Sequence, residues 1–302
     1  MKLGTNDIGS VYLGTNAVQK VYLGTNEVWS SYAYLLDDYS GAAAAYSLRL
    51  LRSAYTGDAI EVRRASDNTT QDIGFVNNEL DVTSLESFCS GTNGFVTTWY
   101  DQSGNGRDAT QGTDASQPQI VSSGSVISKN GKPTIQFDGS DDFFNTANKL
   151  LQLNTTIALA FDFTRENVYG TPIGQWSSGT IGRTLLTTNQ TISGADSSNN
   201  MNFFNQTATG LQDIVAPSGM NLVFWNINTG SNNYQVFNNG SNEFNATITS
   251  IATNVNTAIG VLSESTTSGN FDGVISELIF WSSIQTSRTN IETNINDFYS
   301  IY

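Results

Sequence analysis

The sequence predicts a mainly β protein: a β-sandwich with a few short helices, preceded by a small N-terminal segment of β-repeats. Only 13% of the 302 residues are charged, about half the usual share. Polarity comes instead from Asn, Thr, Ser and Gly, which suit strands and tight turns. Strand-like runs separated by Gly, Asn and Ser clusters fill most of the chain after residue 90. Before them, Leu-Gly-Thr-Asn recurs every ten residues, at Leu3, Leu13 and Leu23.

The repeats predict short strands that fold back at each Gly-Thr-Asn, because Gly14-Thr15 and Gly24-Thr25 fit the centre of a type II′ hairpin turn. Apolar side chains alternate onto both faces, and so small a sheet is marginal on its own. We therefore predict an anchor or oligomerisation segment at residues 1–32 and a sandwich domain at residues 33–302. The alternative is that the segment docks on its own downstream domain. The residues predicted to contact a partner are Leu3, Ile8, Val11, Tyr12, Leu13, Val18, Val21, Tyr22, Leu23 and Val28.

The sandwich domain is predicted to begin with a helix. After Ser40, which can cap it, Ala44, Leu48, Leu51 and Tyr55 fall on one helical face. Residues 59–64 then alternate as a strand. Further along, Thr83 and Glu86 form a capping-box pattern before a short helix near residues 85–89.

Strands dominate the remainder of the domain. They are predicted within residues 94–102, 132–139, 156–163, 183–188, 221–228, 234–240 and 271–281, and this spacing is typical of a β-sandwich. The last twenty residues return to helix, with Ser287 as a cap and a stripe formed by Ile291, Ile295, Phe298 and Tyr302. A terminal helix of this kind would bury its stripe against the sandwich.

Charge and residue usage exclude several classes of function. The net charge of −14 disfavours nucleic acid and anionic membranes as partners. The chain contains no histidine, so any catalysis must use carboxylates. Cys89 is the single cysteine and cannot form an internal disulfide. No apolar run approaches a membrane span and no secretory signal is recognisable, so we expect a soluble protein made in the cytoplasm.

The stretch DQSGNGRD is the candidate glycan or metal loop. Asp101, Ser103, Asn105 and Asp108 surround a tight glycine turn, partly like the opening of a calcium loop. Gly112 stands where such a loop carries a bidentate glutamate. Asx turns that hold the end of a strand are therefore the favoured interpretation, and no cofactor or metal is expected, with calcium the weak alternative.

Other chemistry-bearing residues also have structural interpretations. The Asp138–Asp142 turn could hold a hard cation, but a solvated hairpin turn is favoured. Glu277, the only charge in an apolar strand, and Cys89 are expected to be structural. The tryptophans in strand runs are expected in the core, whereas Trp176, in a Gly/Ser-rich segment, is the candidate for stacking on a sugar ring.

Two stretches resemble a known family. Residues 88–111, FCSGTNGFVTTWYDQSGNGRDATQ, are similar to the core of the arabinofuranosidase B-type catalytic domain, supported by AAAYSLRLLRSAYTGDAIEVRR upstream and FDGVISELIFW downstream. FDGSDDFF, at residues 137–144, and the downstream stretch also resemble the wider group of laminin-G-like lectins. The resemblance covers roughly residues 31–302 and implies a concanavalin A-like jelly roll.

Several residues that the resemblance associates with activity are absent. The enzymes have a second cysteine where Gly94 stands and a vicinal cysteine pair where Leu159-Ala160 stands. Their nucleophile lies in an Asp-Leu-Glu-Asn-Gly strand, whose counterpart at residues 185–194, LLTTNQTISG, has no carboxylate. Their acid lies in a Gly-Asp-Asn loop, and the counterpart here offers only Glu264. Retaining glycosidases need two carboxyl groups about 5–5.5 Å apart, so we predict no catalytic residues and no enzymatic activity.

The repeated decads followed by a lectin-like jelly roll resemble bacteriophage virion proteins. We therefore predict a virion structural protein, a head fibre, tail fibre or decoration subunit, made in the host cytoplasm. It would bind other virion proteins through residues 1–30, form a homo-oligomer, with the trimer as the common state of such fibres, and display its jelly roll for adhesion to host glycans. Nucleic acid and membranes are not expected as partners. The alternatives are a glycoside hydrolase of arabinofuranosidase type and a purely structural spacer.

Overall fold

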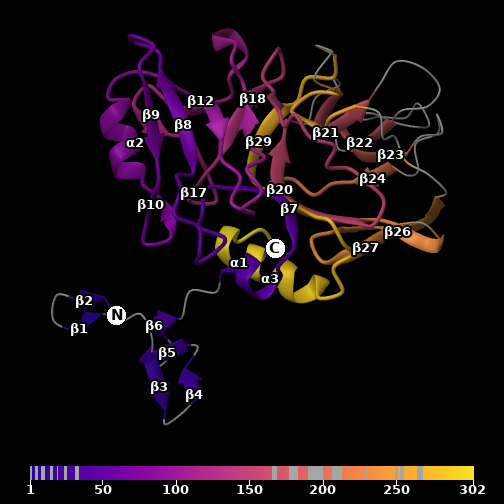
Figure 1. Ribbon diagram of the computed structural model, residues 1–302, viewed down its shortest axis with the longest axis horizontal. Coiled ribbons are helices and arrows are strands. Elements are labelled where there is room, and N and C mark those ends of the chain that lie inside the picture. The colour runs from indigo at the N-terminus through magenta and orange to yellow at the C-terminus, as the bar shows by residue number, and fades with distance from the viewer. Residues whose placement is uncertain are drawn as a thin grey trace. The chain divides into compact units, whose positions relative to one another are not determined.

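The computed structural model divides the chain into two compact units, Met1–Tyr34 and Leu35–Tyr302 (Figure 1). The structure describes residues 2–3, 6–7, 11–13, 16–18, 20–23, 26–30, 34–164, 169–176, 183–189, 200–205, 213–228, 230–248, 251, 255–263 and 268–302.

The first unit contains three short antiparallel hairpins. They pair β1 (Lys2–Leu3) with β2 (Asn6–Asp7), β3 (Val11–Leu13) with β4 (Asn16–Val18), and β5 (Lys20–Leu23) with β6 (Asn26–Ser30). In each decad the Leu before Gly-Thr faces the Asn after it, as Leu13 faces Asn16 and Leu23 faces Asn26. The predicted fold-back at each Gly-Thr-Asn is therefore confirmed. Within the described residues each decad forms its own two-stranded sheet.

The second unit is a large antiparallel sheet arrangement with a few short helices, as predicted for a β-sandwich (Figure 1). Its helices are α1 (Leu35–Asp38), α2 (Val82–Phe88) and α3 (Arg288–Tyr299), with a 3₁₀ turn at Asp114–Ser116. Its strands up to residue 145 are β7 (Ala42–Ser47), β8 (Ile60–Arg64), β9 (Thr70–Ile73), β10 (Phe75–Val76), β11 (Glu79–Leu80), β12 (Gly94–Trp99), β13 (Ala109–Thr110), β14 (Gln119–Ser122), β15 (Ser125–Val126), β16 (Ser128–Lys129), β17 (Lys132–Pro133), β18 (Ile135–Asp138) and β19 (Phe144–Asn145). The later strands are β20 (Thr155–Phe163), β21 (Gly170–Trp176), β22 (Arg183–Thr188), β23 (Asn200–Asn205), β24 (Asp213–Val215), β25 (Asn221–Ile227), β26 (Gly230–Asn238), β27 (Ser241–Ile248), β28 (Ala258–Ile259) and β29 (Asp272–Trp281).

Strand β20 shows how the layers are built. It is hydrogen-bonded to β25 on one side and to β29 on the other, both antiparallel. Its side chains alternate, so that Ile157, Leu159 and Phe161 enter the main core, whereas Ala158 and Ala160 face the opposite side of the sheet. Every residue of β20 is buried because both faces of the strand are covered. This explains why the sequence of the strand is a nearly continuous apolar run.

The helices α1 and α3 cover the outer face of β25, β20, β29 and β7 (Figure 1). Leu35 and Leu36 of α1 and Ile291, Ile295 and Tyr299 of α3 pack against small or apolar strand residues on this face. The predicted stripe of the last helix is thus confirmed for its isoleucines, whereas Tyr302 lies beyond the helix and is 54% exposed. No helix in the described part of the chain is long and apolar enough to cross a membrane.

The helix predicted from Ser40 is wrong, because the alanine run forms strand β7. Ala44 and Tyr46 enter the main core while Ala42 and Ala45 lie under the helices, so this strand is apolar on both faces. A strand covered on both sides has no period-2 pattern, and the alanines have high helix propensity. Pairing with β29 overrides that propensity.

The helix predicted after Thr83 exists, but its cap differs. The N-cap of α2 is Asp81, whose carboxylate accepts a hydrogen bond from the Ser84 backbone N–H at 3.0 Å. Glu86 does not reach back to form a capping box; instead its carboxylate accepts the Val126 backbone N–H at 3.0 Å. Ser287 is the N-cap of α3 but makes no side-chain cap bond.

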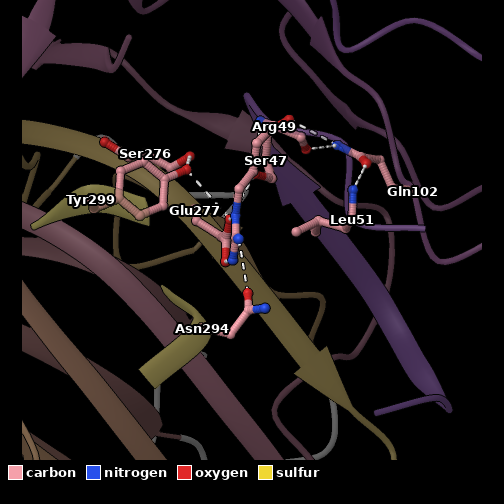
Figure 2. A network of polar contacts seen from close by, with 8 residues as sticks. All are labelled: Ser47, Arg49, Leu51, Gln102, Ser276, Glu277, Asn294 and Tyr299. Atoms are coloured by element: carbon pink, nitrogen blue, oxygen red, sulfur yellow. Dashed lines mark hydrogen bonds and ion pairs between the residues drawn. The ribbon is translucent and has the colours of Figure 1, made fainter. Parts of the chain in front are cut away.

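A buried ion pair joins Arg49, which follows β7, to Glu277 of β29, and hydrogen bonds link this pair to β7 and α3 (Figure 2). The Arg49 guanidinium donates to the Glu277 carboxylate through Nε at 2.7 Å and Nη2 at 2.9 Å, and its Nη1 donates to Asn294 Oδ1 at 2.8 Å. Ser47 Oγ donates to Glu277 at 2.8 Å. The side chains of Arg49 and Glu277 are 3% and 1% exposed. Glu277 is therefore a charge-paired structural residue that fixes the terminal helix to the sheet.

Candidate functional site

The predicted DQSGNGRD loop follows β12 and is held by its own side chains. Asp101 is buried, and its two carboxylate oxygens accept four hydrogen bonds from three residues. These come from the backbone N–H groups of Ala45 and Ser103 at 2.8 Å, from Ser103 Oγ at 2.7 Å and from the Arg107 N–H at 3.0 Å. The bond to Ser103, two residues on, is that of an Asx turn.

The other predicted residues of this loop lie beside Asp101. Asp108 accepts the Asp101 backbone N–H at 2.9 Å, and the Asn105 amide donates to the Ala42 carbonyl at 2.9 Å and the Ala43 carbonyl at 3.1 Å. The structure thus brings Asp101, Ser103, Asn105 and Asp108 together, and their hydrogen bonds fasten the loop to β7.

Trp176 does not join this loop. It ends β21, which pairs with β22 and β28 rather than with β12. Its side chain is half-buried, whereas Trp99, Trp225 and Trp281 are fully buried. The expectation that the strand tryptophans lie in the core is confirmed. Cys89 is likewise buried, in the main core.

The residues predicted to contact a partner through the N-terminal repeats lie on the hairpin strands, with one exception. Leu3 is in β1, Val11, Tyr12 and Leu13 in β3, Val18 in β4, Val21, Tyr22 and Leu23 in β5, and Val28 in β6. Ile8 lies outside the described residues.

The Asp138–Asp142 turn gathers carboxylates. One oxygen from each of Asp138, Asp141 and Asp142 lies within 4.8 Å of the other two. Asp138 accepts the Ser140 N–H at 2.8 Å, and Asp142 accepts the Asp138 N–H at 3.0 Å. Asp142 is 6% exposed, whereas Asp138 is exposed. The turn is therefore only partly solvated, in contrast to the expectation of an ordinary hairpin turn.

Two more carboxylates lie on the outer face near this turn. Asp138 faces Asp272 directly across the β18–β29 ladder, and Gln136 and Asp162 both pair with Val274. Because paired residues point to the same face, Asp138, Asp272 and Asp162 occupy one surface. Like charges directly opposite each other destabilise a sheet, so this arrangement needs another reason to exist.

A groove of about 320 Å³ opens on that surface and is lined by Lys129, Gln136, Asp162, Thr164 and Asp272. Lys129 Nζ lies 2.6 Å from Asp162 Oδ2, and Thr164 Oγ1 donates to Asp272 Oδ1 at 2.8 Å. Lys129 comes from the β16–β17 hairpin, whose Asn130 donates to the last carbonyls of α3. We call this groove, together with the Asp138–Asp142 turn, the acidic groove.

Burial and neighbouring charge raise the pKa of one carboxyl group in the acidic groove. Burial of Asp142, together with the nearby charges of Asp138 and Asp141, raises the pKa of its carboxyl to about 7. A buried carboxyl with a raised pKa beside an exposed one is the arrangement that divides acid from base in carboxylate chemistry. The Asp138–Asp142 turn can therefore offer a proton donor, and the lining of the groove adds carboxylate acceptors for sugar hydroxyls and the Lys129 ammonium group.

The sequence contained a signal for the acidic groove that our prediction missed. The dipeptide Phe-Asp occurs at residues 137–138, 161–162 and 271–272, each time at or near a strand end. The three phenylalanines enter the main core, so the aspartates that follow them must point to the outer face.

The family model described as alpha-L-arabinofuranosidase B, catalytic, matches residues 37–145. Among curated proteins, alpha-L-arabinofuranosidase B of Emericella nidulans is 42% identical over 71 residues, which is 23% of this chain and 14% of that protein. The alpha-L-arabinofuranosidase of Hypocrea jecorina is 40% identical over 70 residues, again 23% of this chain and 14% of the relative. The aligned region is thus a small part of these relatives.

Solved structures extend the likeness over most of the second unit. A GH54 α-L-arabinofuranosidase soaked with a cyclic sulfate inhibitor has a TM-score of 0.68 at 16% identity, covering 86% of this chain and 64% of that one. An arabinofuranosidase complexed with arabinofuranosyl-α-1,2-xylobiose has a TM-score of 0.63 at 15% identity, with the same coverage. At such identities the likeness establishes the fold, a β-sandwich.

These matches overturn the prediction of a virion structural protein without enzymatic activity, and with it the fibre and decoration roles. The family model and the relatives described above are glycoside hydrolases, which was the alternative. The predicted homo-oligomer, glycan partner, location and lack of a cofactor stay predictions. Residues 37–145 resemble the arabinofuranosidase B catalytic domain, and the second unit has the β-sandwich fold of the GH54 enzymes.

Proposed function

We propose that this protein is a glycoside hydrolase that acts on α-L-arabinofuranosides and that the acidic groove supplies its carboxylates. The match of residues 37–145 to an arabinofuranosidase catalytic domain carries the proposal. The last residues of the matched region include the Asp138–Asp142 turn. The relatives' Asp-Leu-Glu-Asn-Gly strand has no acidic counterpart at residues 185–194, so the carboxylates have to come from elsewhere in the chain.

The geometry of the turn suits the two roles that glycoside hydrolysis needs. Asp142, whose pKa near 7 leaves about half of these carboxyl groups protonated at neutral pH, can give its proton to the oxygen of the leaving group. Asp141 can attack the anomeric carbon, and water then hydrolyses the glycosyl–enzyme bond while Asp142 takes a proton from that water. Carboxylate oxygens within 4.8 Å fit the short separation of a retaining pair better than the wider gap of an inverting pair.

Hydrolysis of 4-nitrophenyl α-L-arabinofuranoside tests the activity. The full-length protein should release 4-nitrophenol. Asp142→Asn should lower kcat by roughly 10²–10⁴-fold, the contribution expected of a general acid, and Asp141→Asn, which removes the nucleophile, should lower it at least as much. Asp297→Asn is a matched control, because Asp297 is exposed on α3, outside the acidic groove. It should leave the rate unchanged.

Two results would contradict parts of this proposal. If the full-length protein releases no 4-nitrophenol from this substrate at any pH between 4 and 8, the proposed activity is wrong. If activity is present but survives in both aspartate variants, the acidic groove is not the catalytic site. Glu264→Gln then becomes the decisive variant, because Glu264 is the remaining candidate acid; it lies outside the described residues.

We also propose that residues 1–32 join copies of the chain. Two-stranded hairpins are marginal alone in water, and each decad forms only a two-stranded sheet of its own within the described residues. Deleting residues 1–30 should leave a folded monomer, because the second unit has its own core. Light scattering measures the outcome, and an unchanged mass per particle after deletion of the segment would contradict an oligomerisation role.

A further inference from the structure

A second cavity, of about 490 Å³, lies between α1, the start of β7 and the loop after β12. Its polar lining comes from Asp37, Ser40, Arg52, Ser103 and Asn105. None of these residues belongs to the acidic groove. The volume is within the range of small-molecule sites. Gly41, Ala42 and Ala54 also line the cavity and contribute little side-chain volume to it.

Arg52 is fixed at the edge of this cavity. Its Nη1 donates to the Ser103 carbonyl at 3.0 Å. The next residue, Gly104, has φ +89°, and a Cβ added there would lie 2.5 Å from the same Nη1. The positive φ favours glycine at this position, and a side chain there would displace the guanidinium.

Arg52 also lacks the carboxylate partner that four other arginines have. Arg49, Arg63, Arg64 and Arg288 each pair with a carboxylate. Arg52 makes no salt bridge to any residue that the structure describes, and its hydrogen bond to the Ser103 carbonyl uses one of five N–H donors. In a chain of net charge −14, a fixed guanidinium without a carboxylate partner that lines a cavity is an unusual feature.

The rest of the lining offers groups for hydroxyls. Asp37, exposed on α1, lines the cavity, and its two carboxylate oxygens accept the Ser53 N–H at 3.2 and 3.3 Å, which leaves lone pairs for other donors. Ser40 adds a hydroxyl. The lining residues that the structure describes include no aromatic side chain, so recognition here is polar rather than by ring stacking.

We propose that this cavity binds a uronic acid unit of a polysaccharide. The sugar carboxylate pairs with the Arg52 guanidinium, for which a fork of N–H donors is the matching geometry. The sugar hydroxyls donate to Asp37 and exchange hydrogen bonds with Ser40. The site is a binding subsite separate from the acidic groove, and it does not depend on the catalytic proposal.

Titration of the full-length protein with D-glucuronate, followed by calorimetry or ligand-observed NMR, tests the site. Glucuronate should bind at least tenfold more tightly than glucose, which lacks the carboxylate, and than acetate, which lacks the hydroxyls. Equal binding of glucose and glucuronate would overturn the role of Arg52. Equal binding of acetate and glucuronate would overturn the sugar as ligand and leave a simple anion site.

Variants locate the binding. Arg52→Gln should weaken glucuronate binding about tenfold to hundredfold, the loss expected for a charge-assisted hydrogen-bonded pair. Gly104→Ala should also weaken it by displacing the guanidinium. Gly106→Ala is the matched control, since Gly106 also has a positive φ, +65°, but a Cβ there meets nothing within 4 Å. Binding that survives in Arg52→Gln, with an unchanged melting temperature, would refute the proposal.

Discussion

Substitution of Glu277 by glutamine tests how the terminal helix is held to the sheet. The change keeps the shape of the side chain but removes the charge that pairs with Arg49 at 2.7 Å. Arg49 would keep its guanidinium buried without a counter-charge, and breaking a buried pair in this way costs about 3–5 kcal/mol. That is a large part of the 5–15 kcal/mol of a typical domain. At roughly 2–4 °C per kcal/mol, the melting temperature should fall by about 6–20 °C.

Urea unfolding followed by tryptophan fluorescence measures this loss, and a double variant isolates its cause. Replacing both Arg49 and Glu277 by methionine removes both charges, so the double variant should recover most of the stability lost in Glu277→Gln. If Glu277→Gln costs less than about 1 kcal/mol, the pair is not desolvated as the structure indicates. If the double variant is as unstable as the single one, lost packing and not an unpaired charge is the cause.

Three further predictions concern the loops and the core. The carboxyl of Asp142 has a pKa of about 7 in the folded protein, against an ordinary value of 3.8. Between these pH values the folded state binds more protons than the unfolded state. The free energy of unfolding should therefore fall as pH rises from about 4 to 7, by up to about 4 kcal/mol. Asp142→Asn should remove this slope in urea titrations, and an unchanged slope would contradict it. Asp101→Ala should lower the free energy of unfolding by about 3 kcal/mol or more, because it leaves three buried or partly buried N–H groups without an acceptor. Calcium should not change the melting temperature of the wild type. A calcium-dependent rise would restore the metal-loop interpretation. Gly260→Ala should lower the free energy of unfolding by at least about 2–3 kcal/mol, since its φ is +90° and the new Cβ would lie 2.6 Å from the Phe137 ring. Gly131→Ala, also at positive φ but in open space, should lower it by only about 1 kcal/mol. Equal losses in thermal unfolding would refute the packing argument.

The strands were predictable where one face differs from the other or where β-branched and aromatic residues dominate. Runs such as residues 271–281 and 221–228 form β29 and β25 within one residue of the expected bounds. Strand β7 was not predictable, because its alanines fit both a helical face and a strand covered on both sides. Only the pairing with β29 decides between the two, and that contact joins residues more than 200 positions apart.

The candidate site was less predictable than the fold. The sequence identified the Asp138–Asp142 turn, but a turn alone does not show that Asp162 and Asp272 lie on the same surface. That follows from the register of β18 and β20 on β29, which a single sequence does not contain. The burial of Asp142 involves another distant segment, since a Cβ added at Gly260, which follows β28, would lie 2.9 Å from the Asp142 carbonyl oxygen.

The Phe-Asp dipeptides connect the acidic groove to the core. The rings of Phe137 and Phe161 lie 5.7 and 6.2 Å from that of Phe271, so β18, β20 and the residue that precedes β29 pack together on the inner face. Each following aspartate is then fixed on the outer face within one residue of a packed ring. The repulsion between Asp138 and Asp272 alone would separate β18 from β29 at this end. The aromatic packing beneath offsets that repulsion, which is why the groove can keep several carboxylates close with a single lysine among its lining residues.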